Sequence, residues 1–408
     1  MSDAASRDAA DPLAGLRQRF ALPQDQLYFD GNSLGALPAH LPAVLEDALR
    51  RQWGEHLISS WNRHGWIDLP RRVGERIAPL VGAAPGQVLC CDSISVNLFK
   101  LLAAALALRP GRRVILIRED DFPTDGYIAA GLAALLGQAR CELRCVPMES
   151  LAAALTEEVA VLLLTEVNYR SGERLAMRLW SRRARDCGAL TLWDLAHSAG
   201  ALPVHLDDCG ADFAVGCGYK YLNGGPGAPA FVYVNRAHGD LRQPLSGWLG
   251  HRAPFDFAAE YAPAPGVLRF QAGTPPVLSM LALDAALDLF EGIDMAQLRD
   301  KSLALADCFL AELGAAGLAA ELECMTPRAP ERRGSQLSLR HDEAWGISQA
   351  LIEAGVIVDF RAPDILRFGF APLYNRFADV AAAVDRLQQV MREERHRDPR
   401  FAERPAVT

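Results

Sequence analysis

Short apolar strands alternate with helical segments between about residues 70 and 235, and this alternation restricts the fold more than any other feature. Apolar runs predict strands at Val114–Ile117, Val159–Leu164, Leu190–Trp193, Phe213–Val215 and Phe231–Val234. Helical patterns between them lie at Val96–Leu108, Gly126–Leu136 and Arg174–Cys187. Continuously apolar strands that alternate with helices predict a parallel sheet covered on both faces. We therefore expect an α/β fold with its functional side chains at the carboxyl ends of the strands.

The pattern changes after Pro275-Pro276. A long amphipathic stretch, Val277–Phe290, leads into a mixed helix and strand pattern that ends near Arg395. We predict a large domain at residues 51–274, a small α+β domain at 275–408 and an N-terminal segment, 1–50, that joins the small domain. A helix is expected at Pro42–His56, whereas the small and polar residues 1–10 predict a frayed end.

Composition excludes several classes of protein. The chain has 408 residues, half of them hydrophobic, and a formal net charge of −8, so no basic field exists to hold nucleic acid. Met1–Phe20 lacks the apolar core of a signal peptide, and the longest apolar run, Leu101–Leu108, is too short to cross a bilayer. The nine cysteines form no CxxC pair, which predicts reduced thiols, no metal site and a cytoplasmic location.

The segment from Leu190 to Gly227 carries the clearest chemical signal. Asp194 closes one predicted strand, and His197 follows three residues later. Tyr219 and Lys220 end a second short strand before a Gly-Gly-Pro-Gly loop, where backbone can approach a ligand closely. An amine and a carboxylate at two strand ends suit pyridoxal phosphate, which needs a lysine for its aldehyde carbon and a carboxylate that keeps its ring nitrogen protonated.

The sequence DLAHSAG at 194–200, followed by GYKYLNGGPG at 218–227, resembles the cofactor-lysine region of the kynureninases, in the aminotransferase class V group. The resemblance extends over most of the chain, from FDGNSLGALP at Phe29–Pro38 to LRFGFAPLYN at Leu366–Asn375. It implies the pyridoxal-phosphate fold type I, with a mostly parallel seven-stranded sheet and a smaller α+β domain. It also implies hydrolysis of L-kynurenine, and of 3-hydroxykynurenine, to anthranilate or 3-hydroxyanthranilate and L-alanine, in tryptophan degradation or the supply of NAD precursors.

The resemblance implies roles for the residues that match its motifs. Lys220 would bind the cofactor covalently and move protons, Asp194 would pair with the ring nitrogen, and Tyr219 would contact the phosphate and serve in acid–base steps. These three are the expected catalytic residues. The other implied cofactor contacts are Ile94 and Ser95 at a helix start near the phosphate, Phe122, Pro123, Thr124 and Asp125 beside the ring, Thr165, and His197.

Two further residues match positions that reach the phosphate from the neighbouring subunit, which implies a homodimer with shared active sites. They are Trp248 in SGWLGH and Thr274 in QAGTPP. Animal relatives carry Asn at the position of Thr274, so the preference between kynurenine and 3-hydroxykynurenine stays open. Arg367 matches the arginine that binds the substrate α-carboxylate through two parallel hydrogen bonds. Ser33, and either Trp61 or His64, match the region that faces the aromatic ring of the substrate.

Two other functions stay open. A cysteine desulfurase or class V aminotransferase would share the fold, but a desulfurase needs a reactive cysteine in a mobile loop beyond the lysine. The cysteines after Lys220 are Cys308 and Cys324, in segments predicted as helix and loop of the small domain. A non-catalytic binding protein of the same fold would be expected to lack the lysine or the aspartate, and both are present.

Overall fold

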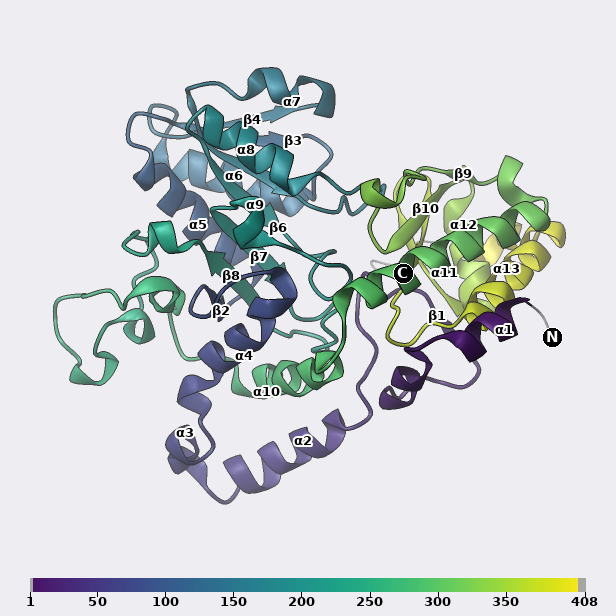
Figure 1. Ribbon diagram of the computed structural model, residues 1–408, viewed down its shortest axis with the longest axis horizontal. Helices are drawn as coiled ribbons and strands as arrows, with labels where there is room; N and C mark the ends of the chain where they lie inside the picture. Colours follow the sequence, from purple (N-terminus) through teal and green to yellow (C-terminus); the bar gives the residue numbers. More distant parts are fainter. Residues whose placement is uncertain (1–2, 403–408) are drawn as a thin grey trace.

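The computed structural model describes residues 3–402, and the large domain is built on a seven-stranded sheet (Figure 1). Its strands follow the order β2-β8-β7-β6-β5-β3-β4. Their bounds are Val88–Cys90 (β2), Val114–Arg118 (β3), Glu142–Val146 (β4), Val159–Thr165 (β5), Leu190–Asp194 (β6), Phe213–Cys217 (β7) and Ala230–Val234 (β8). Strands β3 to β7 run parallel, whereas β8 is antiparallel to both β7 and β2. The expected α/β fold with a mostly parallel sheet is confirmed.

All five strands expected from the sequence are present, each within two residues of its expected bounds. The apolar pattern does not indicate β2 and β4. Strand β2 has three residues, too few to establish a pattern. Strand β4 reads ELRCV and lies at the edge of the sheet, where it pairs with β3 on one side. An edge strand carries charged residues because it meets solvent, which conceals it in a search for apolar runs.

Helices cover both faces of this sheet. Helices α5 (Ile94–Leu108) and α6 (Pro123–Leu136) pack on one face, and α4 (Leu69–Ile77) and α8 (Met177–Asp186) pack on the other. Alternate residues of β5 serve the two faces: Leu163 packs with the first pair of helices and Leu164 with the second. Short helices α3 (Ser60–Arg63), α7 (Met148–Ala154) and α9 (Leu206–Cys209) complete the domain. None of the helices within residues 3–402 is long and apolar enough to span a membrane.

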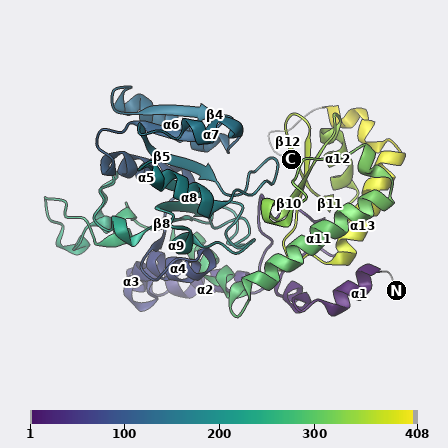
Figure 2. The same cartoon turned by 45° about the horizontal axis from the view of Figure 1, so that its top comes forward.

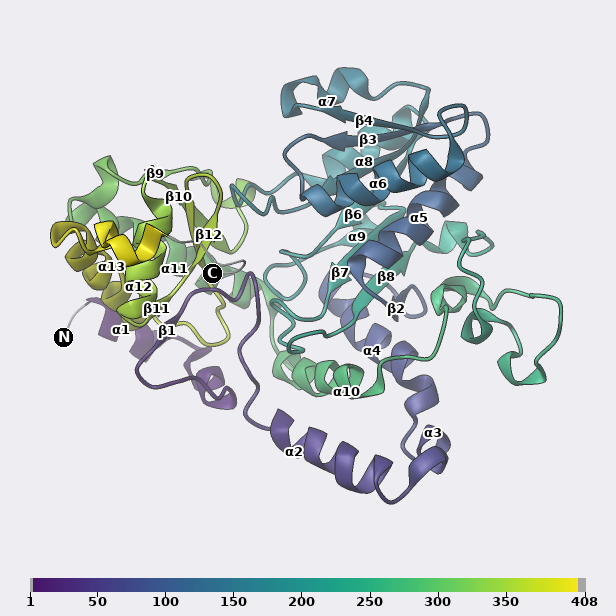
Figure 3. The ribbon, with the colours of Figure 1, turned by 180° about the vertical axis from the view of Figure 1, so that it is seen from behind.

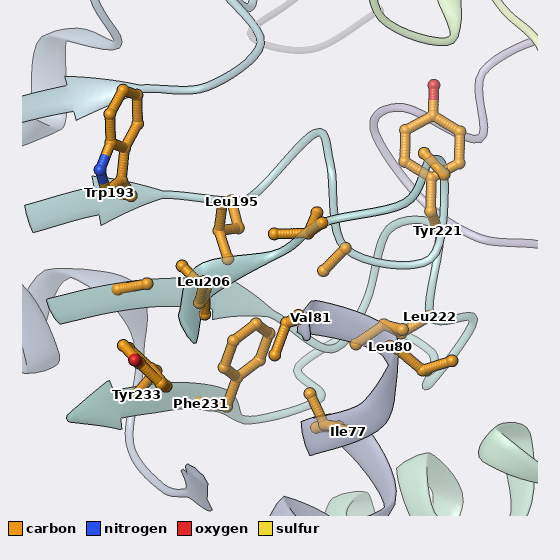
Figure 4. Close-up of a cluster of buried hydrophobic side chains, with 14 of the residues drawn as sticks. Ile77, Leu80, Val81, Trp193, Leu195, Leu206, Tyr221, Leu222, Phe231 and Tyr233 are labelled. Atoms are coloured by element: carbon orange, nitrogen blue, oxygen red, sulfur yellow. The ribbon is translucent and has the colours of Figure 1, made fainter. Parts of the chain in front are cut away.

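Buried side chains on the α4 and α8 face fix the strand ends (Figure 4). Trp193 lies beside Asp194 in β6, and its indole donates a hydrogen bond to the Ser181 hydroxyl at 3.2 Å. Figure 4 shows the Tyr221 hydroxyl directed away from the apolar cluster, and that hydroxyl donates to the carbonyl of Ser335 in the small domain at 3.1 Å. Buried polar groups with partners hold a core in one arrangement. The loop after β7 is thereby tied to both domains.

The small domain contains a four-stranded antiparallel sheet of order β12-β13-β10-β9. The strands are Glu323–Cys324 (β9), Gln336–Arg340 (β10), Asp359–Arg361 (β12) and Ile365–Gly369 (β13), and the helices are Met295–Ala315 (α11), Ala344–Glu353 (α12) and Phe377–Arg392 (α13). Phe309 and Phe368 pack at the centre of its core, with ring centroids 4.5 Å apart. Leu27–Tyr28 (β1) pairs in parallel with Val356–Ile357 (β11), so the N-terminal segment contributes to this part of the molecule.

The expectation of a frayed N-terminus is wrong for residues 3–10. Asp3–Ala10 forms helix α1, which lies against α13 (Figure 2). The Asp8 carboxylate accepts hydrogen bonds from the backbone N–H groups of Phe377 (2.7 Å) and Ala378 (3.0 Å), and the Arg7 guanidinium lies 4.0 Å from the centre of the Phe377 ring. A carboxylate from another helix therefore supplies the N-terminal cap of α13, a tertiary contact that local composition does not reveal. Residues 1–2 and 403–408, which belong to the predicted terminal segments, lie outside the described residues.

The expected helix at Pro42–His56 is present as α2 (Leu41–Asp47), which continues into a π-helical stretch at Ala48–Trp53. Helix α10 (Val277–Ala286) packs against both α2 and α4, and its buried side chains join the core of the large sheet. The boundaries at residues 50 and 275 stay predictions. Figures 1 and 3 both show the connection at about residues 240–265 extending from the large domain on the side away from the small domain.

Candidate active site

The carboxyl ends of β5, β6 and β7 surround a cavity of about 270 Å³. Thr165 and Asp194 are the last residues of β5 and β6, and both face this cavity. Lys220 comes three residues after the end of β7, so it lies in the loop rather than at the strand end where the sequence places it. The residues around the cavity are Ser93, Ile94, Ser95, Phe122, Thr124, Thr165, Asp194, Ala196, His197, Cys217, Tyr219, Lys220, Ala228 and Ala230.

Lys220 and His197 are in direct contact inside the cavity. The Lys220 amine Nζ lies 3.2 Å from His197 Nε2, and Nδ1 of the same imidazole is buried without a partner. Burial lowers the pKa of Lys220, and Arg367 and Arg361 lower it further. Burial followed by the charge of Lys220 holds the pKa of His197 well below its usual range. A lysine with a lowered pKa is a better nucleophile, because more of it is present as the neutral amine.

Asp194 and Asp125 form a buried pair of carboxyl groups. Asp194 Oδ1 accepts a hydrogen bond from the Ala196 N–H at 2.7 Å, whereas both carboxyl oxygens of Asp125 are buried without a hydrogen-bond partner. Burial raises the pKa of Asp194, and burial with the adjacent Asp194 raises the pKa of Asp125 well above its usual range. Buried oxygens without partners require either a proton or a cationic ligand. The pair therefore fits the protonated ring nitrogen of pyridoxal phosphate.

The first turn of α5 provides an anion site. Ser93 is the N-cap, and its hydroxyl accepts a hydrogen bond from the Val96 N–H at 3.3 Å. Ile94 and Ser95 are the first two residues of the helix and both border the cavity. The unpaired N–H groups and the dipole at this end of a helix attract a phosphate. The N-cap of α5 is thus Ser93, a residue that the sequence does not single out. Ser95 lies in the first turn of the helix, as expected from the sequence.

The segment expected beside the cofactor ring begins α6. Phe122 is its N-cap residue with an exposed ring, Pro123 is its first residue and Thr124 borders the cavity. Pro is favoured at this position because it has no N–H to leave unpaired. Asp125 follows inside the first turn and is buried. Helix geometry thus places the Phe122 ring and the Asp125 carboxyl at the same end of α6.

The N-terminal motif GNSLG packs against the loop that carries Tyr219 and Lys220. Gly35 donates its backbone N–H to the Tyr219 carbonyl at 2.8 Å, beside Lys220. A Cβ atom at Gly35 would lie 2.3 Å from the Lys220 carbonyl oxygen, so no other residue fits this approach. The carbonyl of Tyr219 is therefore held by a segment nearly two hundred residues earlier in the chain. Burial raises the pKa of Tyr219, which keeps its phenol protonated as a hydrogen-bond donor.

Arg367 lies on β13, buried, and its guanidinium is already paired. Nε donates to Asp359 Oδ1 at 2.8 Å and Nη2 donates to Asp359 Oδ2. Nη2 also donates to the Ser33 hydroxyl at 3.3 Å, and Nη1 donates to the Tyr169 carbonyl. The Nε–Nη2 edge of the guanidinium is thus occupied by Asp359. Together with the contacts to Ser33 and Tyr169, four of the five N–H donors of Arg367 are engaged within the chain.

Eight expected residues are not among those that border the cavity of this single chain: Ser33, Trp61, His64, Pro123, Asp125, Trp248, Thr274 and Arg367. Trp248 is exposed and packs beside Phe255 and Phe257, and Thr274 is exposed on the connection to α10. Trp61 and His64 lie at helix α3, where the Trp61 ring contacts Trp66 and His64 Nε2 lies 2.8 Å from Nδ1 of His56. Their roles stay predictions.

Besides Ser93, Ala228 and Ala230, five residues at the site are not indicated by the sequence. Ala196 and Cys217 border the cavity, Asp121 is buried next to Thr165, and Asp359 and Arg361 accompany Arg367. Asp121 Oδ2 accepts the Thr165 N–H at 3.5 Å. The motif Asp-Phe-Arg at 359–361, two charges around one aromatic residue in a short strand, was the available signal for the last two.

Comparison with known proteins agrees with this geometry. Among solved structures, a C-DES variant with glycine covalently linked to its PLP cofactor superposes with a TM-score of 0.77 at 19% identity, over 91% of this chain and 98% of that one. A cysteine desulfurase from Thermococcus onnurineus superposes with a TM-score of 0.75 at 18% identity, over 93% and 98%. The fold and the cavity together define fold type I of the pyridoxal-phosphate enzymes.

Sequence similarity narrows the class to one family. The model of the kynureninase C-terminal domain matches residues 298–387. The kynureninase of Deinococcus radiodurans is 53% identical over 392 residues, 95% of each chain. The kynureninase of Burkholderia pseudomallei is 51% identical over 412 aligned positions, which cover all of this chain and 99% of that one. The chain belongs to the kynureninase family.

Proposed function

We propose that this protein binds pyridoxal phosphate and hydrolyses L-kynurenine to anthranilate and L-alanine. The observation that carries the proposal is the contact between the Lys220 amine and His197 above the buried Asp125–Asp194 pair. It occurs in a chain that is 51–53% identical over nearly its whole length to kynureninases. 3-Hydroxykynurenine, which has the same side chain, is proposed as a second substrate. These reactions belong to tryptophan degradation and the supply of NAD precursors.

The cavity residues would hold the cofactor at three points. The Lys220 amine would bond its aldehyde carbon, the Asp194 carboxyl, with Asp125 next to it, would pair with its ring nitrogen, and the first turn of α5 with Tyr219 would hold its phosphate. Phe122, Thr124, Thr165 and His197 border the same cavity and would contact the ring. When bound, pyridoxal phosphate supplies a protonated ring that withdraws electrons from the substrate α-carbon.

Proton transfers fall to the residues next to Lys220. Once released from the cofactor, the Lys220 amine removes the proton at the substrate Cα, because burial favours its neutral form. His197, neutral at ordinary pH, can accept a hydrogen bond from that amine at Nε2. The Tyr219 phenol, whose pKa burial raises, remains a proton donor. Water adds to the substrate γ-carbonyl, and the Cβ–Cγ bond breaks with release of anthranilate. One proton is then delivered to Cβ, and the return of a proton to Cα completes L-alanine.

Substrate recognition is assigned to the small-domain side of the cavity. Arg367 binds the α-carboxylate at its Nη1–Nη2 end, where the carboxylate takes the place of the Tyr169 carbonyl or of the Ser33 hydroxyl, which lies 3.3 Å from Nη2. Trp61 or His64 faces the aromatic ring of the substrate. Both lie on the α3 segment and can reach an active site only through a different relative placement or from a second subunit.

We propose a homodimer in which each subunit completes the site of the other. A groove of about 530 Å³ borders α2 and α10, and its lining is largely apolar. Leu37, Leu49 and Leu278 are exposed there, and Trp53 and Ile58 are exposed nearby. Apolar surface of this kind is typical of a permanent subunit interface. Trp248 and Thr274 are exposed on the large domain, which supports their insertion into a neighbouring site.

A cytoplasmic location is also proposed. None of the nine cysteines, all of which lie in the described part of the chain, is joined in a disulfide. Reduced thiols in this number favour a reducing compartment.

Anthranilate fluorescence tests the proposed activity. Purified protein supplied with pyridoxal phosphate should convert L-kynurenine to equal amounts of anthranilate and L-alanine. L-Cysteine, tested in parallel, should release no sulfide above the rate without enzyme. Cys308 is buried in α11 and Cys324 is half-buried in β9, and neither borders the cavity. Sulfide release without anthranilate would assign the protein to the desulfurases instead.

A further inference from the structure

Arg361 shares a carboxylate with the substrate-binding arginine. It ends strand β12, and its Nη2 lies 2.7 Å from Asp359 Oδ2. The same Oδ2 accepts a hydrogen bond from Arg367 Nη2 and another, at 2.7 Å, from the Ser33 hydroxyl. Asp359 and Arg367 are direct partners in the register of β12 and β13. Two guanidinium groups and one hydroxyl therefore converge on a single carboxylate.

The charges at this corner of the site do not balance. Burial opposes the ionisation of Asp359, but Arg367, Arg361 and Ser33 together hold the pKa of its carboxyl below the usual range. Asp30 is a further carboxyl at this corner, and its pKa is raised to about 7 by burial and by Asp359. Below that pH two guanidinium charges face one carboxylate charge. A buried excess of positive charge is costly unless an anion binds.

Arg361 is the more accessible of the two arginines. Its side chain is 36% exposed, whereas the side chains of Arg367 and Asp359 are each 1% exposed. The positive charge of Arg361 also affects the expected catalytic residues. Burial is the main cause of the lowered pKa of Lys220 and of His197, and the charges of Arg367 and Arg361 lower both pKa values further. Arg361 is thus a partly solvated cation that belongs to the charge network of Asp359 and Arg367 in the small domain.

We propose that Arg361 is a second substrate-binding residue, which together with Arg367 binds the α-carboxylate of the amino-acid substrate while Asp359 positions both guanidinium groups. The inference rests on the proposed function. It explains how a substrate carboxylate can be bound although Asp359 already occupies the Nε–Nη2 edge of Arg367. With four of its five N–H donors engaged by Asp359, Ser33 and Tyr169, Arg367 has one N–H, at Nη1, left for a ligand, and a second guanidinium supplies further donors and charge.

Variants of Arg361 separate carboxylate binding from general support of the fold. Arg361→Gln removes the charge and keeps a hydrogen-bond donor toward Asp359, and Arg361→Lys keeps the charge without the fork. Arg340→Gln is the matched control: Arg340 lies in the same sheet, its side chain is 39% exposed, and it pairs with Glu323 and Asp364. Thermal unfolding of each variant is measured first, and Arg361→Lys replaces Arg361→Gln if the latter does not fold.

Binding is measured with two ligands that differ in one group. L-Alanine, the product that carries the α-carboxylate, is titrated against the holoenzyme and followed by the visible spectrum of the bound cofactor. The decarboxylated amine of kynurenine is measured as a competitive inhibitor. Arg361→Gln should weaken L-alanine binding and raise the KM for kynurenine by roughly ten- to a hundredfold, and leave the inhibition constant of the amine within about twofold. Arg361→Lys should show an intermediate loss.

The outcomes distinguish this inference from the proposed function. If the wild-type protein forms no anthranilate from kynurenine, the proposed function itself is wrong. Active wild type, together with an Arg361→Gln variant that binds L-alanine as tightly as Arg340→Gln does, overturns the inference alone. Equal losses for L-alanine and the amine would also overturn it, because they would show that Arg361 supports the site as a whole rather than the carboxylate.

Discussion

The amine of Lys220 lies 3.2 Å from Nε2 of His197, and burial lowers the pKa of both groups. Two cations at this distance would repel each other in a site that contains little water. The lowered pKa values instead favour a neutral imidazole and a partly neutral amine, joined by one hydrogen bond. The pair comes from the loops after β6 and β7, so the parallel sheet itself brings the two residues together.

Replacing Lys220 by Ala should abolish the visible absorbance of lysine-bound pyridoxal phosphate and reduce turnover by at least about a thousandfold. Borohydride reduction of the wild type followed by peptide mapping should find the pyridoxyl group on Lys220. Neither of the other two lysines of the chain borders the cavity. Lys100 is buried against Asp92 and the Phe270 carbonyl, and Lys301 pairs with Asp11 at 2.7 Å. Modification of either one would contradict the assignment.

Asp194→Ala should weaken pyridoxal phosphate binding and lower kcat by several orders of magnitude, because an unprotonated ring is a poor electron acceptor. Asp194→Glu should retain a fraction of the activity. Asp125→Asn serves as the comparison, since the Asp125 carboxyl is buried beside Asp194 and is proposed to act with it. Cofactor affinity, measured by fluorescence quenching of the apoprotein, and kcat are both followed. If Asp194→Ala behaves like the wild type and Asp125→Asn does not, the role belongs to Asp125.

The stability of the cofactor-free protein should fall as the pH rises through about 7. Burial raises the pKa of Asp121 to about 7 from 3.8, with the Asp120 and Asp194 charges adding to the rise and Arg118 opposing it. A carboxyl whose pKa is higher in the folded state binds more protons when folded. The contribution of protonated Asp121 to the free energy of unfolding is therefore fully present below pH 3.8 and is lost as the pH rises from 3.8 to about 7. This contribution is at most ~4 kcal/mol.

Thermal unfolding of the apoprotein between pH 5 and 9 measures this effect, with Asp121→Asn as the variant that cannot titrate. Asp121→Asn should flatten the pH dependence near 7 relative to the wild type. Asp30, whose pKa burial also raises to about 7, should supply the part that remains. Identical profiles for the wild type and Asp121→Asn would mean that Asp121 does not carry a proton at neutral pH.

Arg367→Lys should raise the KM for kynurenine by roughly ten- to a hundredfold with a smaller effect on kcat, because an ammonium group cannot reproduce the paired hydrogen bonds of a guanidinium. The buried Asp359 also loses its two-point partner, so the melting temperature should fall as well. Steady-state kinetics and thermal unfolding are measured on the same preparation. An unchanged KM would place the α-carboxylate elsewhere.

Two inactive variants should restore activity when they are mixed. Lys220→Ala lacks the catalytic amine, and the double variant Trp248→Ala/Thr274→Ala lacks the residues proposed to enter the neighbouring site. In a mixed dimer, one site combines an intact Lys220 with intact Trp248 and Thr274 from the other chain. Random pairing predicts recovery to about a quarter of the wild-type activity per subunit. Confirmed subunit exchange without recovery would place both residues in the site of their own chain.

The pattern of residues along the chain determined the large sheet and the ends of its strands. Five apolar runs became strands because a segment that is apolar on both faces is stable only between two layers of helices. Asp194 and Thr165 border the cavity because each is the last residue of such a strand. The pattern missed β4, whose polar residues meet solvent at the sheet edge, and it placed Lys220 on a strand rather than in the loop that follows.

Only the tertiary structure decided which charges face one another. Ser33 and Arg367 are 334 residues apart in the chain yet share a hydrogen bond, and Asp359, which the sequence does not single out, occupies one edge of the Arg367 guanidinium. Asp8 caps a helix 369 residues later, which turned an expected frayed end into α1. Local sequence fixes backbone preference and the side of a strand that a residue faces. Electrostatic partners depend on which surfaces meet when the two domains pack, and burial then sets their protonation.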